Sequence, residues 1–409
     1  MIGKKRVGRF SFFFLLLNDK REEPISRTKK LEEVSLRGFL RYMYGHLRVT
    51  YEAITDSARK RPVIPKDTLA NAIVGATALG ARSLREADFL GRSPVMQACF
   101  ERNPSDTTLA RVAGGFQGTA CVLRRLWRQV RSDGYLGMGR DHVSVIDGTS
   151  WGGHLTSVVA EIGKAPAIIA TRPIPGTGNE LSASLKLIEQ LAVEEGHFAD
   201  YLLGDGLYAC ERFWKACDQV GCWGLAKTSD HEPFAILHQA RMLFDYPVRG
   251  KDIGYQFLEG LDAGRACRYR IWQTTGLWAD TRRRLTIARV EETFLKGQRR
   301  TEVFWVLCQD LGITPQKLLD LMHARWFIEN NVFKAFNDQA HSKHQFSRTA
   351  HTAEVFSHLQ ALAFMAMGAY RSFLARHKEL LPKLWDHGQI PLRLLQSVFR
   401  LVLSPVDSS

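Results

Sequence analysis

The chain has 409 residues, enough for two or three structural units, and its 45% hydrophobic and 24% charged content is typical of a globular protein. A formal net charge of +14 favours a polyanionic partner, with nucleic acid ahead of an anionic membrane surface. No run of 18 apolar residues occurs, so no membrane-spanning helix is expected. Seven scattered cysteines without a CxxC pair argue against a zinc site and favour free thiols in a reducing, cytoplasmic compartment.

Residues 1–65 form a basic N-terminal region, with 16 Lys and Arg against 7 Asp and Glu over residues 1–66. The apolar segment at residues 10–17, FSFFFLLL, follows basic residues as a secretory signal does, but no small-residue cleavage site comes after it. This favours an upstream extension or an N-terminal packing segment over export. We expect part of the region to be disordered, and an amphipathic helix within residues 31–58.

Residues 66–140 are predicted to be a helical DNA-binding region. Ser105 or Asp106 can cap a helix whose apolar residues follow at helical spacing. Four arginines line a further helix, and Arg124 and Arg128 among them are the candidate DNA contacts. A helical scaffold with a solvated basic face fits the same pattern.

Residues 141–236 change to a strand pattern that alternates with helices. The predicted elements, in chain order, are strands at residues 143–146, 155–162 and 167–171, a helix at 180–194, a strand at 201–204, a further helix, and a strand at 222–227. This order predicts an α/β fold with a mixed sheet flanked by helices.

Residues 237–310 are predicted to be a β-rich insertion, because four runs of β-branched and aromatic residues alternate there with polar separators. The Thr-Pro pair at residues 314–315 predicts the start of a long helix. Residues 311–376 contain this helix and an apolar helix at residues 353–372, whose polar residues favour a buried core helix. Residues 377–409 form a C-terminal tail.

Three acidic residues are notable for their placement. Asp147 ends the apolar run in VSVIDGTS, Asp205 ends that in YLLGDGLYA, and Glu329 lies in the helical stretch HARWFIENNVFKAF. Three converging carboxylates can hold two divalent cations for in-line attack at phosphorus, and their hard oxygens suit Mg²⁺ or Mn²⁺. Taken singly, each aspartate is equally typical of a turn before glycine, and Glu329 of a helix surface.

These segments resemble the DDE transposases of bacterial insertion sequences, in the branch with a β-strand insertion and a YREK-type signature. The matching pieces are VIDGTS and LLGDGLYA for the aspartates, GNELSASLKLIEQL for the helix between them, and ARWFIENNVFKAF for the glutamate helix. The Tyr and Lys positions of the signature hold Met322 and Phe336 here, and the nearby lysine is Lys334.

The resemblance implies an RNase H-like core in which Asp147, Asp205 and Glu329 are catalytic and bind two Mg²⁺ or Mn²⁺ ions. It also implies strand cleavage and strand transfer on double-stranded DNA, at terminal inverted repeats and a target, by a homodimer on paired ends. No membrane partner is expected. An RNase H-like endonuclease or resolvase, and an inactive DNA-binding relative, are the alternative hypotheses.

Further residues are candidates for contacts near this site. Arg325 shares the helix face of Glu329 and can brace it or contact the DNA backbone, and Thr149 and Lys334 are candidate phosphate contacts. On an ideal α-helix Lys334 would point about 140° away from Glu329. Trp326 is a core residue or a platform for an extruded base. The histidines 341, 344, 351 and 358 are interpreted as core or DNA-proximal, with His344 the best candidate for an active-site neighbour.

Overall fold

The structure, a computed structural model, describes residues 36–57, 64–93, 104–176, 178–230, 235–245, 253–262, 265–278, 283–295, 301–340 and 349–376. Several predictions concern segments outside these ranges: the apolar segment at residues 10–17, the disorder expected before residue 36, His341, His344, and the tail from residue 377.

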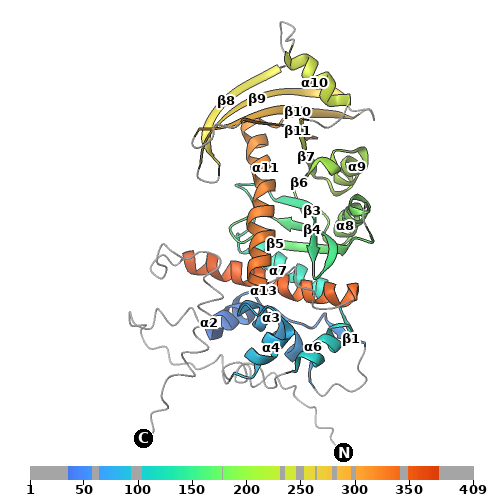
Figure 1. Ribbon diagram of the computed structural model, residues 1–409, viewed down its shortest axis with the longest axis vertical. Coiled ribbons are helices and arrows are strands. Elements are labelled where there is room, and N and C mark those ends of the chain that lie inside the picture. Colours follow the sequence, from blue (N-terminus) through green and yellow to red (C-terminus); the bar gives the residue numbers. More distant parts are fainter. Residues whose placement is uncertain are drawn as a thin grey trace, which may run out of the picture.

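A sheet of nine strands runs through the molecule, in the order β5-β4-β3-β6-β7-β11-β10-β9-β8 (Figure 1). The strands are β3 (Val143–Trp151), β4 (His154–Glu161), β5 (Ala167–Pro173), β6 (Tyr201–Gly204), β7 (Trp223–Ser229), β8 (Ile253–Asp262), β9 (Arg265–Trp278), β10 (Arg284–Phe294) and β11 (Thr301–Cys308).

The first five of these strands form the predicted RNase H-like sheet. β3, β6 and β7 are parallel neighbours, and β4 pairs antiparallel with both β3 and β5. On one face, α8 (Glu180–Glu195) and α9 (Glu211–Val220) lie side by side (Figure 1). The α/β fold with a mixed sheet flanked by helices is therefore confirmed.

The predicted insertion continues the core sheet. β8 to β11 form antiparallel pairs, and β11 closes back on β7 with Val306 opposite Lys227. A helix, α10 (Ala235–Asp245), opens the segment and was not predicted. Its buried residues Leu237, Ala240 and Phe244 recur at helical spacing, which indicates a helix and not the β pattern predicted from residue 237 onward.

A series of helices covers the opposite face. α11 (Pro315–Phe327) begins as predicted, with Thr314 Oγ1 accepting a hydrogen bond of 3.3 Å from Lys317 N. The expected single long helix does not continue unchanged, because a π-helical segment, Ile328–Phe333, separates α11 from α12 (Lys334–Ala340). α13 (Ala350–Arg376) follows and is buried along most of its length. Among the residues described, no helix combines the length and apolarity that a membrane crossing needs.

The N-terminal part is helical, as predicted, and packs beneath α13 (Figure 1). Its elements are α2 (Leu36–Arg41), a π-helical turn (Tyr42–His46), β1 (Thr55–Asp56), α3 (Lys66–Ala78), α4 (Leu84–Gly91), α6 (Asp106–Ala113), β2 (Phe116–Gln117) and α7 (Thr119–Ser132). Ser105 caps α6 as expected, by accepting a hydrogen bond from Thr108 N. The amphipathic helix predicted within residues 31–58 ends at His46, because the chain then pairs as β1 with β2.

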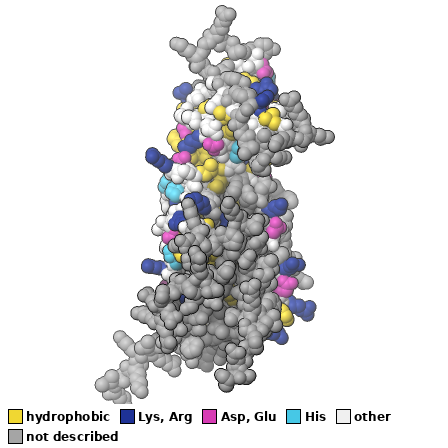
Figure 2. All heavy atoms as spheres, turned by 90° about the vertical axis from the view of Figure 1, so that its left-hand side faces the viewer, with side chains coloured by type: hydrophobic (Ala, Val, Ile, Leu, Met, Phe, Trp, Pro, Cys, Tyr) yellow, Lys and Arg dark blue, Asp and Glu magenta, His cyan; other side chains and the backbone are white. Residues whose placement is uncertain are grey.

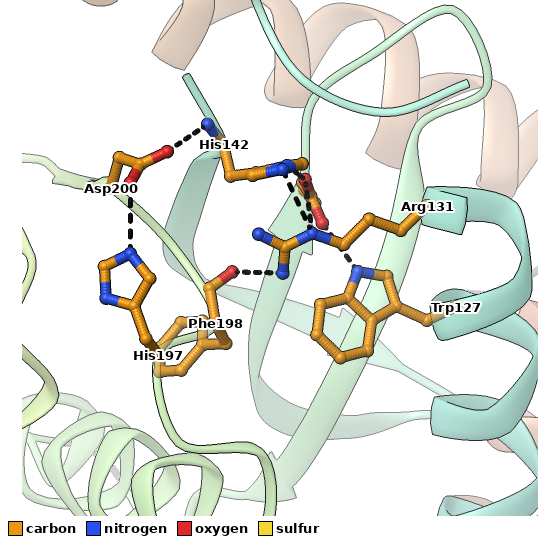
Figure 3. A network of polar contacts seen from close by, with 7 residues as sticks. Trp127, Arg131, His142, His197, Phe198 and Asp200 are labelled. Carbon is orange, nitrogen blue, oxygen red and sulfur yellow. Dashed lines mark hydrogen bonds and ion pairs between the residues drawn. The ribbon is translucent and has the colours of Figure 1, made fainter. Parts of the chain in front are cut away.

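A buried acid, Glu161, anchors α7 to the core sheet, and Figure 3 shows Trp127, Arg131 and His142 of the same network of polar contacts. Glu161, at the end of β4, accepts a 2.6 Å hydrogen bond from Trp127 Nε1 and lies 2.7 Å from His142 Nδ1. Arg131 Nη1 donates to the carbonyl of Phe198 at 3.0 Å. These contacts hold the start of β3 and thereby fix the strand that carries Asp147.

Candidate active site

Asp147 lies within β3 and not at its end, which corrects the prediction. β3 continues to Trp151 because the antiparallel ladder with β4 runs on to the pair Trp151–His154. The parallel ladder with β6 stops earlier, at Val145 opposite Leu203. Asp147 is therefore just past the end of that ladder, where its side chain remains partly exposed.

Asp205 continues the same register on the neighbouring strand. Asp205 comes directly after β6, and extending the register by two residues beyond Val145 and Leu203 leads to Asp147 and Asp205. The carboxylate of Asp205 raises the pKa of Asp147, so the two acids are near each other. Asp205 Oδ1 also accepts a 2.9 Å hydrogen bond from Leu207 N and caps the short turn Gly206–Tyr208.

Glu329 reaches the site from the helical layer on that face. It lies in the π-helical segment after α11, and its Oε1 accepts a 2.7 Å hydrogen bond from Arg325 Nη1. Arg325 is buried, with 9% of its side chain exposed, against 42% for Glu329. The predicted role of Arg325 as a brace for Glu329 matches this geometry.

The charges of the three acids act on one another. Burial, then the carboxylate of Asp205 and then that of Glu329 raise the pKa of Asp147, while Arg325 opposes them, and the net result is a pKa of about 7. A carboxyl so placed is costly to ionise without a nearby cation. The sequence therefore brings together at one sheet edge three acids that are far apart along the chain.

This donor set suits a hard divalent cation in its chemistry, because carboxylate oxygens that disfavour each other's ionisation gain from a shared cation. The described residues do not contain a ready-made cage, since no three His, Cys, Asp or Glu side chains among them meet closely enough to enclose an ion. Glu329 is turned toward Arg325. Binding would require the Glu329 side chain to rotate toward the aspartates.

A fourth carboxylate, Glu180, adjoins the site and was not predicted. It is the first residue of α8 and accepts a 3.3 Å hydrogen bond from Tyr208. A Cβ at Gly148 would lie 2.5 Å from its carboxyl carbon, so a larger residue there would displace the Glu180 carboxylate. Burial and then Asp205 raise the pKa of Glu180. In sequence, an acid in the first turn of a helix is explained by the helix dipole, so nothing marked Glu180 as part of a site.

The other residues predicted to contact DNA differ in where they lie relative to the three acids. Thr149 follows Asp147 on the same face of β3, while Lys334 is exposed at the start of α12. The angle of about 140° expected for Lys334 does not apply, because π-helical bonding stacks residues five apart. Arg124 and Arg128 form ion pairs with the Glu194–Glu195 end of α8. These pairs give the two arginines a structural role, and DNA contact by them stays a prediction.

Two of the four histidines lie in the described ranges and both tie α13 to the N-terminal part. His358 is buried and lies 2.9 Å from both Thr119 Oγ1 and Thr171 Oγ1. His351 Nε2 lies 3.0 Å from the carbonyl of Phe116. Both positions are structural, in keeping with the interpretation of His358 as a core residue.

No family model and no curated protein sequence matches this chain. Among solved structures, a cryo-EM structure of the piggyBac transposase in a synaptic complex with hairpin DNA is similar, with a TM-score of 0.41 and 9% identity. The alignment covers 97% of this chain and 82% of that one.

Proposed function

We propose that this chain is the DDE transposase of an insertion sequence, cleaving and joining DNA strands with divalent metal ions. One observation carries the proposal: Asp147 and Asp205 lie where the parallel ladder of β3 and β6 ends, and both Asp205 and Glu329 are close enough to raise the pKa of Asp147. The continuous β insertion between the second aspartate and the glutamate favours this function over a small resolvase, which has no need of one.

Each part of the site has a role in this chemistry. Two Mg²⁺ or Mn²⁺ ions held by Asp147, Asp205 and Glu329 would activate the attacking hydroxyl and stabilise the leaving 3′-oxygen. Pairing with β4 fixes Asp147, and the hydrogen bond from Leu207 N holds the Asp205 carboxylate, so their oxygens are oriented before DNA arrives. Arg325 pairs with Glu329 in the metal-free site, and Glu329 would rotate from this ion pair toward the aspartates when metal binds.

DNA binding is proposed from charge. Residues 1–66 carry a net +9 of the chain's +14, which suits the phosphate backbone through counterion release. On the face in Figure 2, Lys and Arg side chains stand among Asp and Glu and form no single uninterrupted patch within the coloured, described residues. Base reading at the terminal repeats is assigned to the N-terminal helical part, and a homodimer on paired ends completes the proposal.

The proposal is tested first by the DNA beside the gene, which should carry inverted repeats flanked by short direct duplications. A duplex of one such end then serves as substrate at fixed salt and Mg²⁺. Asp147→Asn, Asp205→Asn and Glu329→Gln should each abolish cleavage on a gel, because each removes a metal ligand. Binding by anisotropy should be unchanged or tighter, because each change removes a negative charge near phosphate.

Glu189→Gln is the matched control, since Glu189 is exposed on α8. Cleavage at near wild-type rate by any of the three site variants would remove that residue from the metal site. Wild-type protein that binds the duplex but shows neither cleavage nor Mn²⁺-dependent thermal stabilisation would instead support the inactive DNA-binding relative.

A further inference from the structure

Lys227 stands in line with the two aspartates on the next strand of the sheet. β6 and β7 pair in parallel, with Leu203 opposite Leu225 and Gly204 opposite Ala226. Extending this register by one residue leads to Asp205, just past the end of β6, and to Lys227 within β7. The extended registers therefore predict that Asp147, Asp205 and Lys227 follow one another across the face that Glu329 approaches.

Two aromatic rings hold the ammonium group of Lys227. Its Nζ lies 4.4 Å from the ring centre of Phe304 on β11 and 4.5 Å from that of Trp326 at the end of α11. Both distances are within the range of cation–π attraction. The insertion and the glutamate helix thus fix the lysine from two sides, and the face of Trp326 that meets Lys227 is occupied.

The charge of Lys227 is close to the acidic site. Burial and then the Arg325 charge lower the pKa of Lys227 to about 8. Glu329 is one of the carboxylates that act in the opposite direction, so its charge is near the ammonium group. Lys334 follows the π-helical segment five residues after Glu329 and is exposed, so the two lysines are compared in the test below.

We propose that Lys227 contacts a phosphate of the DNA strand held at the metal site. Lys227, on β7, would thereby supply the positive charge of the lysine that the YREK-type signature has and this chain lacks at position 336. The inference rests on the proposed function and adds a positioning residue to it. A phosphate held at the metal site of the two aspartates would lie beside Lys227. There the fixed ammonium group would orient the phosphate oxygens and offset their negative charge. A lysine acts here as a point charge, which a ring clamp can hold without bidentate geometry.

The test compares variants that separate charge from packing. Lys227→Met keeps an aliphatic side chain between the two rings, while Lys227→Arg keeps the charge. Binding of an end duplex, nicked at the cleavage position, is measured over a series of salt concentrations. Cleavage is measured in a single turnover at saturating protein. Thermal unfolding with and without Mn²⁺ reports folding and the metal site.

Lys227→Met should lower the slope of log Kd against log salt by about 0.9, the loss of one phosphate contact on duplex DNA. Its cleavage should slow on the order of 100-fold, as for loss of one preorganised stabilising group. Lys227→Arg should restore both, and Mn²⁺ stabilisation should persist in each variant. Lys215→Met, at an exposed lysine of α9, is the control and should match wild type.

The proposal is overturned if Lys227→Met keeps the wild-type slope and rate, or if Lys334→Met gives these losses in its place. It is also overturned if Lys227→Arg is as impaired as Lys227→Met and both unfold early, since the lysine is then only a packing clamp. Failure of the proposed function is read separately, from wild-type protein that binds the duplex but does not cleave it with metal. In that case the slopes of log Kd against log salt still show whether Lys227 contacts a phosphate.

Discussion

Asp147 is a carboxyl group in surroundings that favour its neutral form. Burial, Asp205 and Glu329 together raise its pKa from the ordinary 3.8 to about 7. A folded-state pKa above the unfolded value stabilises the fold fully below about pH 4, and that contribution is lost as pH rises through about 7. Metal-free protein should therefore lose stability from this group between those two pH values.

Asp147→Asn tests this at the level of one residue. In EDTA at pH 8, the variant should be more stable than wild type by on the order of 1 kcal/mol, because the amide removes the repulsion. At pH 4 the two should be nearly equal in urea unfolding. Adding Mn²⁺ at pH 8 should stabilise wild type and not the variant. Equal stability at both pH values in EDTA would mean that neither burial nor the neighbouring carboxylates raise the pKa of Asp147.

The element that joins the core to the N-terminal helices is α13. His358 binds Thr119 of α7 and Thr171 of β5, and burial lowers its pKa from 6.5 to about 3. A histidine pKa depressed in the fold stabilises the protein above about pH 6.5, and the stabilisation is lost as pH falls toward 3. Wild type should lose on the order of 1 kcal/mol per pH unit from this source below about pH 6.

His358→Gln is the corresponding variant for urea unfolding between pH 7 and pH 4. It should cost about 1–3 kcal/mol at pH 7, since buried hydroxyl partners lose a hydrogen bond. The gap from wild type should shrink toward pH 4, where the histidine must gain a proton. Asp147 shifts stability in the opposite direction over this interval, so the comparison is made in the Asp147→Asn background. A gap that stays constant with pH would show that His358 does not titrate in this way.

Among the helices and strands, the sequence predicted those features that depend on a local pattern of residues. The strand Tyr201–Gly204 has the predicted bounds, and Thr314 caps α11, because apolar runs and capping residues act over a few positions. The extent of β3 was missed, since the polar residues after Asp147 are held in a strand by pairing with β4. Lys227 and Glu180 were missed because their place at the site depends on strand order and packing, which no local spacing reveals.

For the whole molecule, the shared ladder between β7 and β11 predicts cooperative unfolding of core and insertion. Ile287→Ala, at a residue with no exposed surface in β10, should cost about 2–5 kcal/mol. It should lower the midpoint temperature of a single unfolding transition. Circular dichroism should show one transition, and that same transition should be the one that Mn²⁺ stabilises. The control is Thr275→Ala, at an exposed position of β9. Separate transitions, with the Mn²⁺-responsive one unmoved, would show that the insertion folds on its own.

The same continuous sheet also constrains how such a protein can evolve. α11 rests on the insertion, where Gln273 Nε2 donates to the carbonyl of Ile313 at 2.8 Å and His323 stacks edge-on against Tyr269. Two of the acids are set by the core strands, but the third is set by a segment outside them. Recombination therefore cannot exchange the insertion without affecting the helix that leads to Glu329. A graft from a relative would keep activity only if it returned Glu329 to its place beside the aspartates.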